Sequence, residues 1–153
     1  MKKWMFTLLA LVVFGMGELS AQSYNSAVGL RGGYYLTGSY KKFIKDTHAI
    51  EAYAGIGAYY GGGLVVGGLY QIHKEIPNVG IENLYWYYGG GAYGSMGSGW
   101  FDAGVNLNIG LDYAFNEFPI NVSLDWAPGI NLIGGIYPSW VTGGFAVRYI
   151  LGK

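Results

Sequence analysis

Apolar and polar residues alternate with a two-residue period along most of the chain after residue 21. In residues 102–115, every second position from Val105 to Tyr113 is apolar, and the positions between them are Asn, Gly or Asp. This alternation is typical of a strand with two different faces. We expect strands at about residues 27–37, 49–60, 64–73, 83–93, 102–115, 119–126, 130–135 and 143–151.

The connections between these segments predict how the strands are joined. GSYKKFIKDTH (38–48) is a long loop, whereas GGG (61–63) is a short turn, and Pro128-Gly129 is expected to turn the chain again. Long and short connections in alternation, with an even strand number, are typical of outer-membrane barrels. The pattern therefore predicts an all-β protein, an eight-stranded antiparallel up-and-down transmembrane β-barrel.

The charged residues of the strands fall on one face. Opposite the continuous apolar face lie Arg31, Glu51, Asp112, Asp125 and Arg148. An Arg on the lipid face would cost roughly 2–4 kcal/mol at the bilayer midplane, so we expect these charges inside, where they must pair. Eight strands leave an interior that side chains fill, and no open pore is expected.

His73 is expected to join this lumenal polar network. If Gly62 is the centre of the glycine turn, residues whose numbers sum to about 124 face each other, which places Glu51 opposite His73. Register is sensitive to how the turn closes, because a shift of one residue moves every side chain to the other face.

The N-terminal residues predict export of the protein, and the composition limits its possible partners. Residues 1–21 combine Lys2 and Lys3, a short apolar run and a small-residue exit, which predicts a secretory signal peptide before a barrel domain at 22–153. Charged residues make up only 12% of the chain and cysteine is absent, so a disulfide framework is excluded. The near-neutral charge balance argues against a nucleic-acid partner.

Three stretches carry a family resemblance: WYYGGGAYG (86–94), NIGLDYAFNEFPINVSLDWAPGINLIG (108–134) and GGFAVRYIL (143–151). With the signal peptide and the alternating segments, they resemble the small bacterial outer membrane protein beta-barrel domain family, whose members are similar to the barrel of outer-membrane protein A. The resemblance implies a porin-like, Gram-negative cell outer membrane protein, inserted by the barrel-assembly machinery and without enzymatic activity. One departure is the end of the chain, Leu151-Gly152-Lys153, where such barrels usually end on an aromatic residue.

The loop 38–48 holds the only basic cluster of the mature chain, Lys41, Lys42 and Lys45. If this loop faces outward, its charges would attract the phosphates of lipopolysaccharide. A solubilising surface loop is the alternative. Outer-membrane lipid is the expected partner in both cases, and we expect a monomer.

Catalytic and metal chemistry have weaker support. His48 and His73 lie near Asp46, Glu51 and Glu75 in the predicted fold, but a solvated and a lumenal histidine explain them without a metal. A lipid-modifying enzyme would need a base beside Ser123, which is expected on the far side of the barrel. The glycine clusters lack a following Gly-Lys-Ser/Thr, so no cofactor is predicted. A secreted lipocalin-like barrel for a small apolar ligand stays the main alternative.

Overall fold

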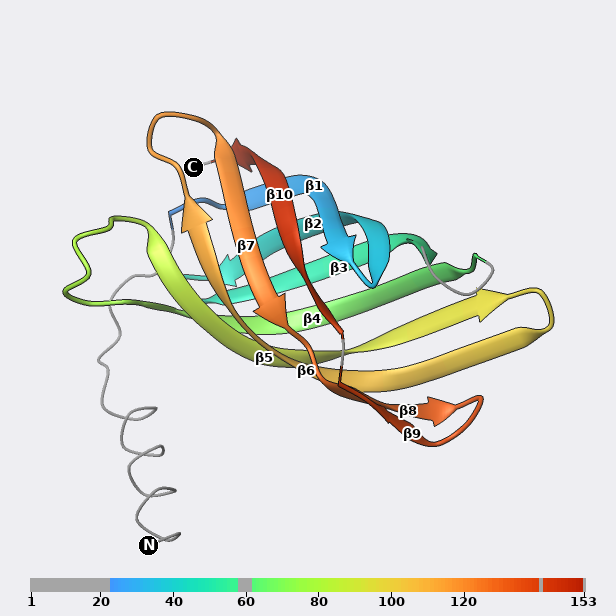
Figure 1. Ribbon diagram of the computed structural model, residues 1–153. Coiled ribbons are helices and arrows are strands. Elements are labelled where there is room, and N and C mark those ends of the chain that lie inside the picture. Colours follow the sequence, from blue (N-terminus) through green and yellow to red (C-terminus); the bar gives the residue numbers. More distant parts are fainter. Residues whose placement is uncertain (1–22, 58–61, 141, 153) are drawn as a thin grey trace, which may run out of the picture.

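The computed structural model describes residues 23–57, 62–140 and 142–152, and all regular structure in these ranges is β-strand (Figure 1). None of the described residues forms a helix long and apolar enough to span a bilayer. The predicted signal peptide, residues 1–21, lies outside the described residues. The strands are β1 (Ser26–Gly33), β2 (Tyr35–Lys45), β3 (His48–Gly57), β4 (Leu64–Glu75), β5 (Leu84–Gly97), β6 (Trp100–Ala114), β7 (Ile120–Trp126), β8 (Gly129–Ile133), β9 (Tyr137–Ser139) and β10 (Gly143–Gly152).

Eight of these strands close into an antiparallel barrel. Strands β1 to β6 each pair with the next, and β10 closes the circle by pairing with both β7 and β1. The β5–β6 pair is continuous over its whole length, from Leu84 opposite Tyr113 to Gly97 opposite Trp100. The expected all-β, eight-stranded antiparallel barrel is confirmed, but its strands are not the eight predicted segments.

The first correction concerns residues 27–37, which form two strands rather than one. The chain reverses at Tyr34, so that Arg31 lies opposite Thr37. The predicted loop 38–48 is therefore mostly strand β2. Gly32 and Gly33 before Tyr34 are the local turn signal, and residues 35–44 keep a two-residue alternation that the three lysines obscured.

The second correction concerns Pro128-Gly129, which interrupts a strand without reversing it. Ile109 faces Trp126 and Asn106 faces Gly129 in one unchanged register, so β7 and β8 follow the same neighbour, β6. Proline has no N–H to give to a ladder, and its carbonyl still accepts a hydrogen bond of 2.8 Å from the Leu107 N–H. The predicted seventh strand is thus the continuation of the sixth.

The barrel has two unlike ends. Ser26 and Gly152 lie side by side at one end, which we call the terminal end. The opposite end, the hairpin end, carries the β1–β2 turn, the β5–β6 turn and the β8–β9 hairpin, and the β5–β6 pair extends there beyond its neighbours (Figure 1). Because of the extra reversal at Tyr34, the last residues of β3 and the first residues of β4 also lie at the hairpin end.

The register between β3 and β4 also differs from the prediction. Glu51 faces Leu69, and Ile56 faces Leu64, so the numbers of paired residues sum to 120 rather than 124. The expected pairing of Glu51 with His73 is therefore wrong. Both residues nevertheless point into the interior, because a shift of four residues leaves the faces unchanged.

Candidate functional site

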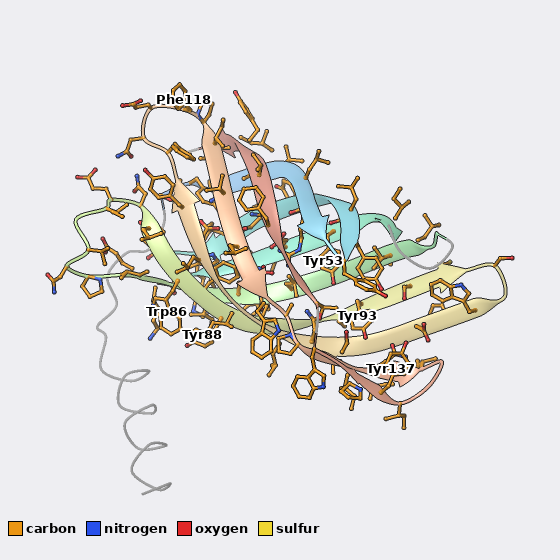
Figure 2. All side chains as sticks on the ribbon, viewed as in Figure 1. Tyr53, Trp86, Tyr88, Tyr93, Phe118 and Tyr137 are labelled. Carbon is orange, nitrogen blue, oxygen red and sulfur yellow. The ribbon has the colours of Figure 1, made fainter. Side chains whose placement is uncertain are left out.

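The barrel has an apolar outside and a polar inside. Leu30, Leu107 and Leu124 project outward from three strands and are 64%, 68% and 59% exposed. In Figure 2, carbon-rich side chains surround the barrel wall. Six charged side chains that point inward are buried, namely Arg31, Lys41, Glu51, Asp112, Asp125 and Arg148. A soluble protein distributes its side chains the other way.

An apolar cluster seals the lumen at the terminal end. It consists of Tyr24, Ala27, Phe43, Ala49, Ala114 and Ile150. Tyr24 precedes β1, and its ring meets Phe43 edge-on at 5.1 Å. Burial and then the neighbouring Asp112 carboxylate raise the pKa of Tyr24 well above its usual range. Its hydroxyl therefore stays protonated and points at Asp112, 3.3 Å away.

Asp112 is the innermost carboxylate of the terminal half. The Lys41 ammonium lies 2.7 Å from its Oδ2, and both side chains are fully buried. The Asn121 amide donates to the other carboxylate oxygen at 2.8 Å. A buried charge is stable only when it is paired and hydrogen-bonded, and Asp112 meets both conditions.

Glu51 and Arg148 form the centre of the network. Arg148 Nη2 lies 2.5 Å from Glu51 Oε1, and Glu51 also accepts hydrogen bonds from Ser39 at 2.6 Å and Gln71 at 2.9 Å. A second Arg148 nitrogen donates to the hydroxyl of Ser123 at 2.8 Å. The Ser123 hydroxyl oxygen thus accepts a hydrogen bond from Arg148.

A third pair joins this centre to the hairpin half. Arg31 makes two hydrogen bonds to Asp125, at 2.8 and 2.5 Å, and Arg31 Nη1 lies 3.9 Å from Glu51. Tyr87 donates to Asp125 at 2.6 Å. A Cβ at Gly110, which pairs with Tyr87, would lie 2.8 Å from its ring. Glycine thus makes room for the ring in a narrow lumen.

Lys41 is the network residue that the sequence reasoning missed. It was assigned to a surface loop, but it lies in β2 with 0% of its side chain exposed. Lys42 and Lys45 are exposed, at the terminal end of the same strand. With Lys41, three cations face three carboxylates, whereas two cations were expected. The unbalanced charge of the predicted network was the signal that a cation was missing.

The two histidines lie on opposite faces of the barrel wall, His73 inside and His48 outside. His73 is fully buried, its ring stacks on Tyr87 at 4.9 Å, and both its ring nitrogens lack a hydrogen-bond partner within the described structure. Its Nε2 is 3.9 Å from Asp112. His48 contacts the Tyr70 hydroxyl on the outside. The described residues hold no group of three or more His, Cys, Asp or Glu arranged for a metal.

The hairpin half of the lumen is hollow. A cavity of about 550 Å³ opens there, with Arg31 at its inner boundary. Its walls carry five tyrosines and two tryptophans, together with a few polar side chains: Tyr34, Tyr35, Tyr53, Tyr93, Tyr137, Trp100, Trp140, Asp102, Asn106 and Asn131. Figure 2 shows Tyr53, Tyr93 and Tyr137 at this end.

Asn131 and Asp102 form the polar part of the cavity wall. The Tyr93 hydroxyl donates to the side-chain oxygen Oδ1 of Asn131 at 3.3 Å. The side-chain nitrogen Nδ2 of Asn131 donates to Oδ1 of Asp102, also at 3.3 Å. Burial and then the Asp102 carboxylate raise the pKa of Tyr137, which donates a hydrogen bond to Asp102. The sequence pattern predicts no role for these residues, because they come together only where β5, β6 and the β8–β9 hairpin meet.

Aromatic side chains also gather on the outside near both ends. Trp86 and Tyr88 project outward near the terminal end (Figure 2) and stack on each other at 5.3 Å. Trp126 lies near the hairpin end, where its indole N–H donates to the Trp140 carbonyl at 2.7 Å. Aromatic residues in two belts flanking an apolar band are typical of membrane-embedded barrels.

The fold and lumen together define an eight-stranded antiparallel β-barrel whose interior is filled by side chains in the terminal half and holds a cavity in the hairpin half. Comparisons with protein-family models, curated proteins and solved structures find no match to this chain.

Proposed function

We propose that the protein is a small integral β-barrel of the outer membrane, with a structural or surface-interaction role and no catalysis. The observation that carries this proposal is the inversion of polarity across the wall. The charged side chains of the central network, such as Glu51 and Arg148, are buried inside, while large aliphatic side chains such as Leu107 are exposed. In a bilayer those aliphatic side chains would be buried in lipid.

The extent of the apolar surface supports a membrane location. Soluble monomers rarely expose contiguous apolar patches larger than a few hundred Å², whereas here every strand of the barrel wall has at least one large exposed apolar residue. A tilted strand needs roughly 9–11 residues to span a bilayer. Six of the eight wall strands have ten or more, and β1 and β7 have eight and seven.

The orientation follows from the family resemblance. In such barrels both termini face the periplasm, after export and insertion by the assembly machinery. The hairpin end and its cavity would then face outward, and Lys42 and Lys45 would lie on the periplasmic side. Contact with lipopolysaccharide would therefore involve the outward aromatic residues rather than a basic loop.

The packing of the terminal half supports a lumen that is closed to solutes rather than an open pore. The apolar cluster around Tyr24 and the paired charges around Asp112 fill the section of the lumen between β1 and the strands opposite. A solute would have to break buried ion pairs to pass. We therefore expect purified protein in planar bilayers to show no steady conductance.

Cell fractionation is the direct test of the proposal. We expect the protein in the outer-membrane fraction, with a gel mobility that changes on boiling because a folded barrel resists detergent. Recovery in the soluble periplasmic fraction, with no heat-dependent mobility, would contradict it. That result would favour the second candidate, a soluble lipocalin-like barrel, for which the cavity of about 550 Å³ is the supporting observation.

A further inference from the structure

Asp102 is a carboxylate without a cation in a structure whose other inward carboxylates are all paired. Within the described residues no Lys, Arg or His forms an ion pair with it, whereas Glu51, Asp112 and Asp125 each have one. Asp102 is half-buried and lines the cavity. Its partners are the Tyr137 hydroxyl and the Asn131 amide.

The hydrogen bonds to Asp102 do not use its full capacity. The Asn131 amide nitrogen is 3.3 Å from Asp102 but only 2.8 and 2.9 Å from the carbonyls of Ile133 and Gly135. Its two hydrogens are therefore shared among three acceptors. An ionised carboxylate offers about four lone-pair sites, so Asp102 can still accept a hydrogen bond from a ligand, and its negative charge can pair with a ligand cation.

Aromatic rings surround this carboxylate. Tyr35, Tyr93 and Tyr137 all lie close enough to Asp102 to interact with it electrostatically, and they line the same cavity. The face of an aromatic ring carries a partial negative charge and attracts a cation within about 6 Å of its centroid. The carboxylate and the rings therefore favour the same sign of ligand charge.

The one cation in the cavity wall does not oppose this preference. Arg31 is held by two hydrogen bonds to Asp125 and lies 3.9 Å from Glu51. Its charge is neutralised within the network, so it is not available to an anionic ligand. The net charge presented to the cavity is that of Asp102.

We propose that the cavity at the hairpin end binds a small organic cation of the quaternary-ammonium class. Asp102 supplies the counter-charge, and the tyrosine rings contact the methyl groups of the ligand. A volume of about 550 Å³ is within the range of small-molecule pockets. A wholly apolar ligand would leave Asp102 desolvated without a partner, which is unfavourable. This inference goes beyond the proposed function and holds whether or not the barrel lies in a bilayer.

The test is a titration of the folded full-length barrel in a polyoxyethylene detergent, which has no ammonium group. Choline and its neutral isostere 3,3-dimethylbutan-1-ol are compared by tryptophan fluorescence, since Trp100 and Trp140 line the cavity, and by calorimetry. We expect choline to bind at least tenfold more tightly than the isostere. The Asp102→Asn variant should lose that difference, while Glu117→Gln, at the other end of the barrel, should keep it.

Heat-dependent gel mobility of Asp102→Asn shows whether that variant is still folded. Lys42→Met, which changes an exposed side chain near the terminal end of the barrel, should bind choline like the unchanged protein and provides a second folded variant. Equal binding of choline and its isostere, binding of a neutral disaccharide in preference to choline, or no choline binding by a folded barrel would each overturn the proposal. A soluble barrel that still binds choline would contradict the proposed membrane function but leave this inference standing.

Discussion

The two halves of the lumen contain similar residue types but differ in how these residues are used. In the terminal half, Lys41, Asp112 and their neighbours are buried and pair with one another at hydrogen-bonding distances. In the hairpin half, Tyr93, Asn131 and Asp102 line open space. A buried charge network specifies one packing and resists opening, whereas an unpaired carboxylate beside a cavity is suited to a ligand. We infer that the first half stabilises the barrel, and we propose that the second half binds a ligand.

The unequal extents of the wall strands explain why the two halves of the lumen differ. β1 ends at Gly33 and β7 at Trp126, whereas β5 and β6 continue to Gly97 and Trp100. At the terminal end all eight strands enclose the lumen, and side chains from opposite strands meet. At the hairpin end the short strands stop, the β8–β9 hairpin follows β6 instead (Figure 1), and a cavity lies inside the wall.

The largest effect is expected from two adjacent lysines of β2. Lys41→Met removes the ion-pair partner of Asp112 and leaves a buried, uncompensated carboxylate, at a cost of about 3–5 kcal/mol. Lys42→Met alters an exposed side chain and should change the free energy of unfolding by less than about 0.5 kcal/mol. Urea titration of both variants in phospholipid vesicles measures the difference.

Equal effects of the two lysine substitutions would contradict the assignment of Lys41 to the lumen. A double variant, Lys41→Met with Asp112→Leu, gives a further control. Because it removes both charges together, it should recover much of the stability that the single substitution loses.

Substitutions of two aspartates, one in the charge network and one in the cavity wall, compare the stability contributions of these two regions directly. Asp125→Asn weakens the hydrogen bonds from Arg31 and Tyr87 and should cost roughly 1.5–3 kcal/mol. Asp102→Asn removes a charge that no described cation balances, and the expected change is within about 0.5 kcal/mol. The same unfolding titration applies, and a larger loss for Asp102→Asn than for Asp125→Asn would show that the halves are not as described.

The smallest effect is expected within the cavity wall. Tyr93→Phe removes only the hydrogen bond to Asn131, which is long at 3.3 Å, so the cost should not exceed about 0.5–1.5 kcal/mol. Tyr87→Phe, which loses a 2.6 Å bond to a buried carboxylate, is the matched variant of the terminal half. It should lose more stability than Tyr93→Phe in the same titration.

The faces of the strands could be predicted from sequence because alternation survives errors in register. Arg31, Glu51, Asp112, Asp125 and Arg148 were all placed inside, and the structure brings them together. The sequence pattern also predicted the barrel and its strand number. The count was right only because a missed turn at Tyr34 offset a turn wrongly expected at Pro128.

Contacts between distant strands could not be predicted in the same way. Which residue faces Glu51 depends on where the β3–β4 connection is centred, and the three glycines allow several centres. The cavity depends on how far each strand extends before its neighbour stops. Alternation carries no information about either property, and Lys41 was hidden because two neighbouring lysines gave β2 the composition of a loop.

The most direct measurement uses the absence of cysteine from the chain. Leu107 in the middle of β6 and Ile136 at the tip of the β8–β9 hairpin are 68% and 80% exposed, so Leu107→Cys and Ile136→Cys place single thiols at two open positions. In phospholipid vesicles a water-soluble maleimide should label the Ile136→Cys variant readily and the Leu107→Cys variant hardly at all, because lipid covers the barrel wall. Rapid labelling of both variants in folded protein would contradict the membrane barrel and leave a soluble one.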